Sequence, residues 1–438
     1  MLEYPISVVR QHLLGPTLFL GLAGVIFLNV SFFNSPGTGD VVSWRDWTEQ
    51  VVNNGPVGGY CQAQSIYPPG AFAVLWAFGS LIGATLTGVK ASILFFWVCF
   101  VGTVVFVGRW SRLPLVMGAA VALNPAIWFN AQFLGYLDVY YAASLLLAVL
   151  LLRHERHALW SGICFGISIL LKWQPVILLP FFVLMLWKHT CAGRPGWEVL
   201  SRWLAGLGAV VVITALYLLQ GGGLGCMAQS FSNAFQDQFV SGTALNLDWV
   251  ITYVLHVTQP SIHGPLLVTG LSDFIRTEDL LWLRIFNLLT MLVAYGFFLG
   301  LLVSRGRTVL DLGIAALGGG LSYFILGFGV HENHSYILVI IATCIVILDK
   351  ANARSLRLLV FTSLLHIVNL FLFYGFTGRP VVSRMLMGFD DTVIFAAASS
   401  ISLPAVILHA LRNVGFHGAR GAAPTDVARG GRLPDCLS

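Results

Sequence analysis

Long apolar runs constrain this chain more than any other feature, because each is long enough to cross much of the ~30 Å hydrocarbon core of a bilayer as a helix. The 438 residues are 57% hydrophobic and only 10% charged, whereas a soluble domain carries about a quarter charged residues. The runs are continuous and do not alternate with a period of two, which argues against a β-barrel. The sequence therefore predicts an all-α polytopic membrane protein. The runs lie near 13–32, 66–87, 90–108, 114–131, 138–152, 158–171, 176–187, 203–219, 282–303, 309–328, 335–348, 356–376 and 393–411.

Basic residues divide the connecting loops into two alternating sets, and the positive-inside rule assigns the basic set to the cytoplasm. If every run crossed, "RWSR" (109–112) and all later basic loops would face outward, although Arg10 places the N-terminus inside. One run before residue 109 therefore must not cross. The run at 66–87 opens with "PPG" and suits a re-entrant or interfacial segment covered by protein. The other basic loops are "RHERH" (153–157), 188–202, "SRGR" (304–307), "DKANARSLR" (349–357) and the tail after 412.

This topology predicts one transmembrane domain, residues 1–413, with about twelve spanning helices and a non-crossing, membrane-embedded segment in the first outer loop. The two large outer loops are 33–89 and 220–281, and the Gly- and Arg-rich residues 414–438 are expected to form a disordered cytoplasmic tail. A disulfide between Cys61 and Cys226 is one option in the outer loops. Within the first loop, four residues at helical spacing predict an amphipathic helix on the membrane surface, namely Val41, Trp44, Thr48 and Val51.

Unusual polar residues gather at the predicted outer boundary of the membrane. Ionisable groups at this depth are costly and tend to mark functional cavities. Because several separate helix ends deliver them to one side, we expect a reaction chamber that opens outward. These residues are Asp40, Arg45, Asp46 and Glu49 in the first loop, Gln132 and Asp138 in "NAQFLGYLD", Lys172 and Gln174 in "KWQP", and His331, Glu332 and His334 in "VHENH".

Structural roles compete with functional ones at several of these positions. Asp40 and Asp138 both precede helical segments, where an aspartate often serves as an N-cap. Asp46 and Glu49 fall on the wet face of the amphipathic stretch, and Lys172 could extend to the membrane interface.

Two kinds of ligand receive no support from these motifs. "VHENH" lacks the i, i+4 histidine pair of a zinc signature, so no metal cofactor is predicted, with a divalent cation left as an alternative. No basic cluster interleaves with aromatics, so nucleic acid is not an expected partner.

In their order along the chain, these motifs resemble the GT-C superfamily of glycosyltransferases that use polyprenyl-phosphate sugars. "GD…W…YPPGAF" (39–72) is similar to the first luminal loop of dolichyl-phosphate-glucose-dependent glucosyltransferases. "LNPAIWFNAQFLGYLD" (123–138) and "LLKWQPVILLPFF" (170–182) resemble that group and also bacterial and GPI-type mannosyltransferases. "FGVHENHSYI" (328–337) resembles their late "HE" motif. The likeness covers most of residues 13–348.

The resemblance implies an inverting transfer of a hexose, glucose or mannose, from a polyprenyl-phosphate sugar. It assigns the base to Asp40, because a carboxylate can take the proton of a weakly nucleophilic hydroxyl. We take Asp46 as a back-up or orienting acid. The phosphate leaving group requires cations, for which Lys172 and the histidines of "VHENH" are the candidates, with Arg276 a weaker one. The substrate-binding set is Arg45, Tyr67, Gln132, Asp138, Lys172, Gln174, His331, Glu332 and His334.

The sequence thus predicts a membrane hexosyltransferase that acts on a lipid-linked or cell-envelope glycan acceptor at the outer face. Its expected partners are the lipid-linked sugar donor, the glycan or glycolipid acceptor and membrane lipids. Its expected location is a bacterial plasma membrane, or the endoplasmic reticulum membrane in a eukaryote. The alternative from a different class is a twelve-helix secondary transporter or lipid-linked-sugar flippase, which would change no covalent bond.

Overall fold

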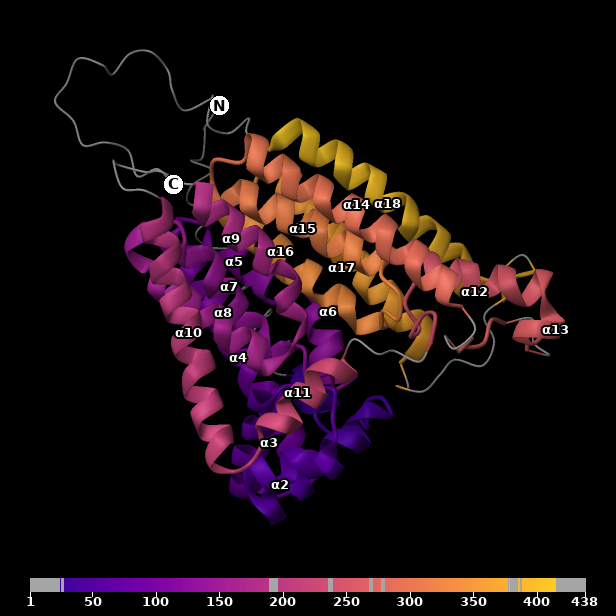
Figure 1. The fold of residues 1–438 in the computed structure, drawn as a ribbon, viewed down its shortest axis with the longest axis horizontal. Helices are drawn as coiled ribbons and strands as arrows, with labels where there is room; N and C mark the ends of the chain where they lie inside the picture. Colours follow the sequence, from indigo (N-terminus) through magenta and orange to yellow (C-terminus); the bar gives the residue numbers. More distant parts are fainter. Residues whose placement is uncertain are drawn as a thin grey trace, which may run out of the picture.

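The structure, a computed structural model, is a bundle of helices (Figure 1). It describes residues 24, 27–188, 196–234, 239–267, 271–276, 280–376, 378, 385–386 and 388–414. The N-terminal half contains α2 (Asp40–Ala63), α3 (Pro69–Ile82), α4 (Leu86–Trp110), α5 (Leu115–Ala122), α6 (Pro125–Trp128), the π-helix η1 (Phe129–Phe133), α7 (Val139–Leu151), η2 (Glu155–His157), α8 (Ala158–Leu171), η3 (Gln174–Leu178), α9 (Leu179–Lys188) and α10 (Gly196–Gln220). The C-terminal half contains α11 (Leu224–Asn233), α12 (Leu247–Thr258), α13 (Pro260–His263), α14 (Leu281–Arg305), α15 (Val309–Leu326), η4 (Glu332–Ser335), α16 (Tyr336–Leu348), α17 (Ala353–Tyr374), the two-residue strands β1 (Met385–Leu386) and β2 (Phe389–Asp390), and α18 (Asp391–Asn413). The strands pair antiparallel with Leu386 opposite Phe389.

Within the described residues, six helices are long and apolar enough to cross a membrane: α4, α10, α14, α15, α17 and α18. Shorter apolar helices, including α7, α3 and α12, accompany them. The chain is therefore an all-helical, multi-pass membrane protein, as its apolar runs predict. The count of about twelve spans stays a prediction, and most of the first run and the predicted tail lie outside the described residues.

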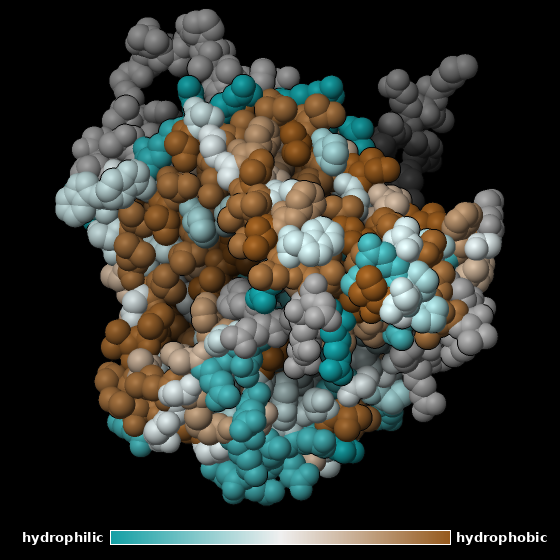
Figure 2. Space-filling model, turned by 45° about the vertical axis from the view of Figure 1, so that its right-hand side comes forward, coloured by the Kyte–Doolittle hydropathy of each residue, from teal (hydrophilic) through white to brown (hydrophobic). Residues whose placement is uncertain are grey.

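Helices differ in what surrounds them. In α16, every residue from Tyr336 to Ile347 is buried. In α15, 83% of the residues in its 18-residue apolar stretch are buried, so these two helices form the centre of the bundle. In the corresponding 18-residue stretches of α10 and α14, only 17% and 22% of the residues are buried. Apolar residues cover most of the face seen in Figure 2, between polar patches at its top and bottom. Apolar helices exposed in this way are the ones expected to face lipid.

Small residues bring the helices of the N-terminal half close together. A Cβ added to Gly162 of α8 would lie 2.0 Å from the carbonyl oxygen of Trp203, and one added to Gly206 of α10 would lie 2.1 Å from that of Leu159. The two backbones therefore approach closely at this crossing, which is how membrane helices associate without a hydrophobic driving force.

The helices α2 and α3 lie together at one end of the bundle instead of along it (Figure 1). Helix α3 has 14 residues, so its length of ~21 Å is too short for the hydrocarbon core. Its first turn touches the end of α8, where a Cβ at Gly70 would lie 2.4 Å from the carbonyl oxygen of Leu170. The run at 66–87 therefore begins with a short helix that packs on protein, and its failure to cross the membrane stays a prediction.

The apolar face of α2 differs from the prediction. Its four residues at helical spacing are buried against protein, with 0–3% exposure, and do not lie on the membrane surface: Val41, Trp44, Thr48 and Val51. The indole of Trp44 donates to the carbonyl of Gly135 at 3.1 Å. The spacing identified the helix and its buried side, but a periodic pattern does not distinguish a protein neighbour from lipid.

The basic loops meet at the opposite end of the bundle, which we call the arginine end. Hydrogen bonds join loops that are far apart in the sequence: Arg153 donates to Ser111 at 2.7 Å, Lys188 to the carbonyl of Gly306 at 3.4 Å, Arg305 to the carbonyl of Leu411 at 3.3 Å and Arg354 to Asn413 at 3.0 Å. The division of charge between loops in the sequence is therefore a division between two ends of the folded chain.

Candidate functional site

Five chain segments bring polar side chains together at the end of the bundle that carries α2. They are the start of α2, the turn before α3, the start of α7, the turn between α8 and η3, and η4 with the residue before it. We call this the carboxylate end. Its side chains form one connected group, the polar cluster, which consists of Asp40, Tyr67, Asp138, Lys172, Gln174, His331, Glu332, Asn333 and His334.

Asp138 and Lys172 form a buried ion pair within the polar cluster. Lys172 donates from Nζ to Oδ1 of Asp138, and their side chains are 8% and 0% exposed, respectively. Asn333 donates to the other oxygen of Asp138 at 3.2 Å. Asp138 occupies the N-cap position of α7 but makes no capping hydrogen bond, and Lys172 does not extend to the membrane interface. The pair therefore fixes α7, the end of α8 and η4 relative to one another.

Gln174 and His334 extend this connection. The amide of Gln174 donates to the carbonyl of His334 and accepts from the hydroxyl of Tyr141 at 3.1 Å. The hydroxyl of Tyr323 lies 2.9 Å from Nδ1 of His334, and the two rings are stacked. Both residues thus have positioning contacts inside the protein.

Glu332 is the most heavily hydrogen-bonded carboxylate of the cluster and is 3% exposed. Three hydroxyl groups donate to it: that of Tyr136, that of Tyr374 at 3.0 Å and that of Thr243 at 2.5 Å. His331 lies 3.9 Å from its second oxygen, and the His331 side chain is 41% exposed. These three hydroxyl groups, from segments far apart in the chain, fix the position of the Glu332 side chain. His331 is its exposed neighbour.

Asp40 is different from the other acids because nothing holds it. Helix α2 begins at Asp40, its N-cap is Gly39, and no side chain caps it. Within the described part of the chain, the Asp40 carboxylate makes no hydrogen bond or ion pair, and it is open to solvent although protein surrounds it on most sides. The capping role considered for Asp40 is thus wrong, and its carboxylate is free to receive a ligand.

The surroundings of Asp40 change its acidity. Burial raises its pKa from 3.8 to about 6, and the negative charge of Glu332 acts in the same direction. His331 and Lys172 oppose this shift. A carboxylate with a pKa near 6 is a stronger base than an ordinary aspartate and is still ionised at neutral pH.

Aromatic side chains form one wall of the cluster. Nζ of Lys172 lies 5.3 Å from the ring centroid of Tyr67, within the range of a cation–π contact. Trp44 and Trp47 pack on the same tyrosine, with ring centroids 5.0 and 5.8 Å from it. The "YPP" motif therefore reaches the site through Tyr67.

Three predicted site residues, Arg45, Asp46 and Gln132, lie outside the cluster. Arg45 and Asp46 form an ion pair with each other at 3.0 Å on the exposed side of α2, where their side chains are 50% and 51% exposed. Neither is among the groups that act most strongly on the pKa of Asp40. The structure thus separates the two aspartates that the sequence placed together, because residues six positions apart on a helix point to different sides.

Gln132 lies behind the site, in the π-helix η1. It is 1% exposed, and neither atom of its side-chain amide has a hydrogen-bond partner in the described residues. Its backbone carbonyl accepts from Nζ of Lys90 at 2.8 Å. Single-turn π-helices often occur at functional sites. Sequence reasoning missed Lys90, although a lysine at the start of a long apolar run is a recognisable signal.

The two segments that the sequence predicts as outer loops pack against each other. Cys61 of α2 and Cys226 of α11 form a disulfide across 165 residues of sequence, and Ser230 donates to the carbonyl of Tyr67 at 2.7 Å. The disulfide considered as one option is present in the structure. It holds α11 beside the helix that presents Asp40.

No protein-family model matches the chain, and no curated protein matches it in sequence. Within the ranges that the structure describes, no three His, Cys, Asp or Glu side chains converge to hold a metal ion. The chemistry of the site must therefore be argued from its own residues.

Proposed function

We propose that this protein is an inverting glycosyltransferase that moves a hexose from a polyprenyl-phosphate sugar to a lipid-linked or envelope glycan. The observation that carries the proposal is the Asp40 carboxylate, which is unpaired, open to solvent and raised in pKa to about 6 inside a polar cluster built by five segments. The resemblance of the motifs to GT-C enzymes supports the same assignment, because Asp40 occupies the Gly-Asp position of the first loop.

In the proposed reaction, Asp40 takes the proton from the acceptor hydroxyl while the acceptor oxygen forms a bond to C1 of the sugar. The bond between C1 and the phosphate oxygen breaks on the opposite face, and the lipid phosphate leaves with the electron pair. The configuration at C1 is inverted. Each bond that forms is matched by one that breaks.

The cluster supplies distinct roles for the remaining groups. Lys172 is neutralised by Asp138, so its role is to hold the site together. His331 is the partly exposed cationic candidate near Asp40, and it is the residue we assign to the departing phosphate. A fixed donor at a developing negative charge contributes about 3–4 kcal/mol in well-organised sites.

The test uses the full chain in vesicles with synthetic polyprenyl-phosphate glucose or mannose and a set of lipid-linked acceptors. Product mass reports the addition of one sugar. We expect Asp40→Asn, which keeps the size but removes the base, to lower transfer by about 10²–10⁴-fold. The matched control is Asp46→Asn on the exposed side of the same helix, and it should retain near-normal transfer.

Three results would count against the proposal. Near-normal transfer by Asp40→Asn would show that Asp40 is not the base. Loss of activity in Asp46→Asn alone would move it to the other aspartate. Movement of the lipid-linked sugar across the vesicle membrane without any product would support the transporter alternative.

A further inference from the structure

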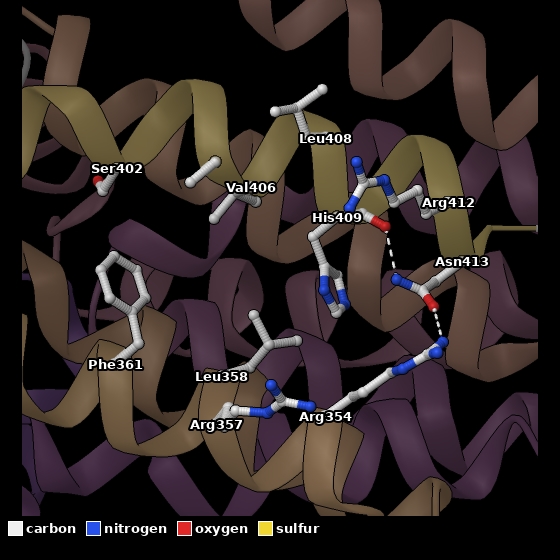
Figure 3. A pocket seen from close by; sticks show the side chains of 11 residues that line it. Arg354, Arg357, Leu358, Phe361, Ser402, Val406, Leu408, His409, Arg412 and Asn413 are labelled. Atoms are coloured by element: carbon white, nitrogen blue, oxygen red, sulfur yellow. Dashed lines mark hydrogen bonds between the residues drawn. The ribbon is translucent and has the colours of Figure 1, made fainter.

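A cavity lies at the arginine end of the bundle, between the first half of α17 and the second half of α18 (Figure 3). Its volume is about 680 Å³. Polar and basic side chains gather at the helix ends, while Leu358, Phe361 and Val406 line the part toward the middle of the bundle. None of these residues belongs to the polar cluster, so the cavity is a separate feature of the molecule.

Three arginines line the cavity: Arg354, Arg357 and Arg412. Arg354 donates to Asn413 at 3.0 Å, and Arg357 donates to the carbonyl of Ala353 at 3.2 Å. No carboxylate pairs with any of the three among the residues that the structure describes. Guanidinium groups match phosphate in shape and charge, so three of them around one hollow form an incomplete anion site.

The acidic side chains near this end lie outside the main cavity. His409 also lines that cavity, and Arg354 borders a smaller adjoining cavity of about 260 Å³ that is also lined by Asp349. The main cavity itself has no acidic lining residue.

The two halves of the cavity together fit an amphiphile. Arg354 lies in the first turn of α17, and Phe361 follows seven residues later, which corresponds to ~10 Å along a helix. On α18 the order is reversed, with Ser402 deep and Arg412 in the last turn. The arginines thus mark the membrane border, and the apolar wall extends toward the hydrocarbon. Basic pockets between membrane helices on the cytoplasmic side are suited to anionic lipid head groups.

We propose that this cavity binds one anionic phospholipid, with its phosphate between Arg357 and Arg412 and an acyl chain against Leu358, Phe361 and Val406. Free phosphate would leave the apolar half uncovered. The chain's own residues 415–438 are a poorer occupant, because three arginines outnumber two aspartates there and would face three more. The inference does not depend on the proposed sugar transfer.

The experiment is native mass spectrometry of the full chain in detergent, titrated separately with dioleoyl phosphatidylglycerol, dioleoyl phosphatidylcholine and inorganic phosphate. We expect the first phosphatidylglycerol to bind at least ~10-fold more tightly than phosphatidylcholine, a preference of about 1.4 kcal/mol. Phosphate alone should not compete at equal concentration. Equal affinity for the two lipids, or full competition by phosphate, would overturn the proposal from measurements on the wild type alone.

Variants then locate the site. The double variant Arg357→Gln with Arg412→Gln should lose most of the preference, and Arg357→Lys with Arg412→Lys should retain part of it, because the charge is kept. The matched control is Arg109→Gln, an exposed arginine at the end of α4 that does not line the cavity, and it should bind as the wild type does. Retention of the full preference by the double Gln variant would show that the lipid binds elsewhere.

Discussion

The two ends of the bundle treat charge in opposite ways. At the carboxylate end, Asp138 and Glu332 are buried and each has several partners from distant segments. At the arginine end, Arg357 and Arg412 are exposed and have no acidic partner in the described chain. Buried charges are tolerated only when paired, whereas exposed ones cost little. The carboxylate end is therefore held together by buried carboxylates with several partners each, and Asp40, whose carboxylate has no such partner among the described residues, is the exception.

Removing one member of the buried Asp138–Lys172 pair should have the largest effect on stability at either end of the bundle. We expect Lys172→Met to destabilise the protein by about 3–5 kcal/mol, because it leaves Asp138 buried and without its cation. The midpoint of thermal unfolding in detergent measures the effect. The double variant Lys172→Met with Asp138→Leu should recover much of the loss. A single variant as stable as the wild type would show that the two groups do not form the pair.

The raised pKa of Asp40 predicts how the activity at the carboxylate end depends on pH. Because the base must be ionised, kcat/KM for sugar transfer should be constant above pH 7 and fall by about tenfold per pH unit below 6. The measurement is the initial rate of transfer from pH 4.5 to 8 at low donor concentration. A profile that is flat down to pH 4.5 would contradict the assignment of Asp40 as the base.

The same pKa predicts a smaller effect on stability. The folded protein binds a proton at Asp40 more tightly than the unfolded chain does, so ionisation of this group destabilises the fold as the pH rises from 3.8 to about 6. Asp40→Asn should therefore unfold at a slightly higher temperature than the wild type at pH 7.5. This gain should shrink as the pH is lowered toward 4, and a gain independent of pH would point to a different cause.

The smallest effect is expected at the arginine end. Arg357→Gln should change the free energy of unfolding by less than about 0.5 kcal/mol in detergent without added lipid, because it breaks only one exposed contact to a carbonyl. Thermal unfolding of this variant beside Lys172→Met compares the two ends directly. A loss comparable to that of Lys172→Met would mean that this arginine has a buried structural role.

Much of the fold follows from one-dimensional patterns, since apolar runs and basic loops predict the helices and the two ends of the bundle. The sequence also identifies most of the polar cluster, because charged groups beside apolar runs are conspicuous. The partners of Glu332 could not be predicted, as Tyr136 and Tyr374 look like ordinary apolar core residues and lie far from it in the chain. A separation of 34 residues likewise concealed the pairing of Lys172 with Asp138. Capping remained an alternative until those partners were known.

The disulfide between Cys61 and Cys226 has a consequence for how the protein is made. Its two cysteines are 165 residues apart, so the N-terminal thiol is synthesised long before its partner. The bond closes only after α10 has been produced and both segments have entered the same oxidising compartment. Until then, α2 and its aspartate are held on the bundle by packing and hydrogen bonds, without a covalent link to α11. Closure of this disulfide is thus a late event in biogenesis, and a cell that lacks an oxidising compartment would accumulate the protein with the bond unformed.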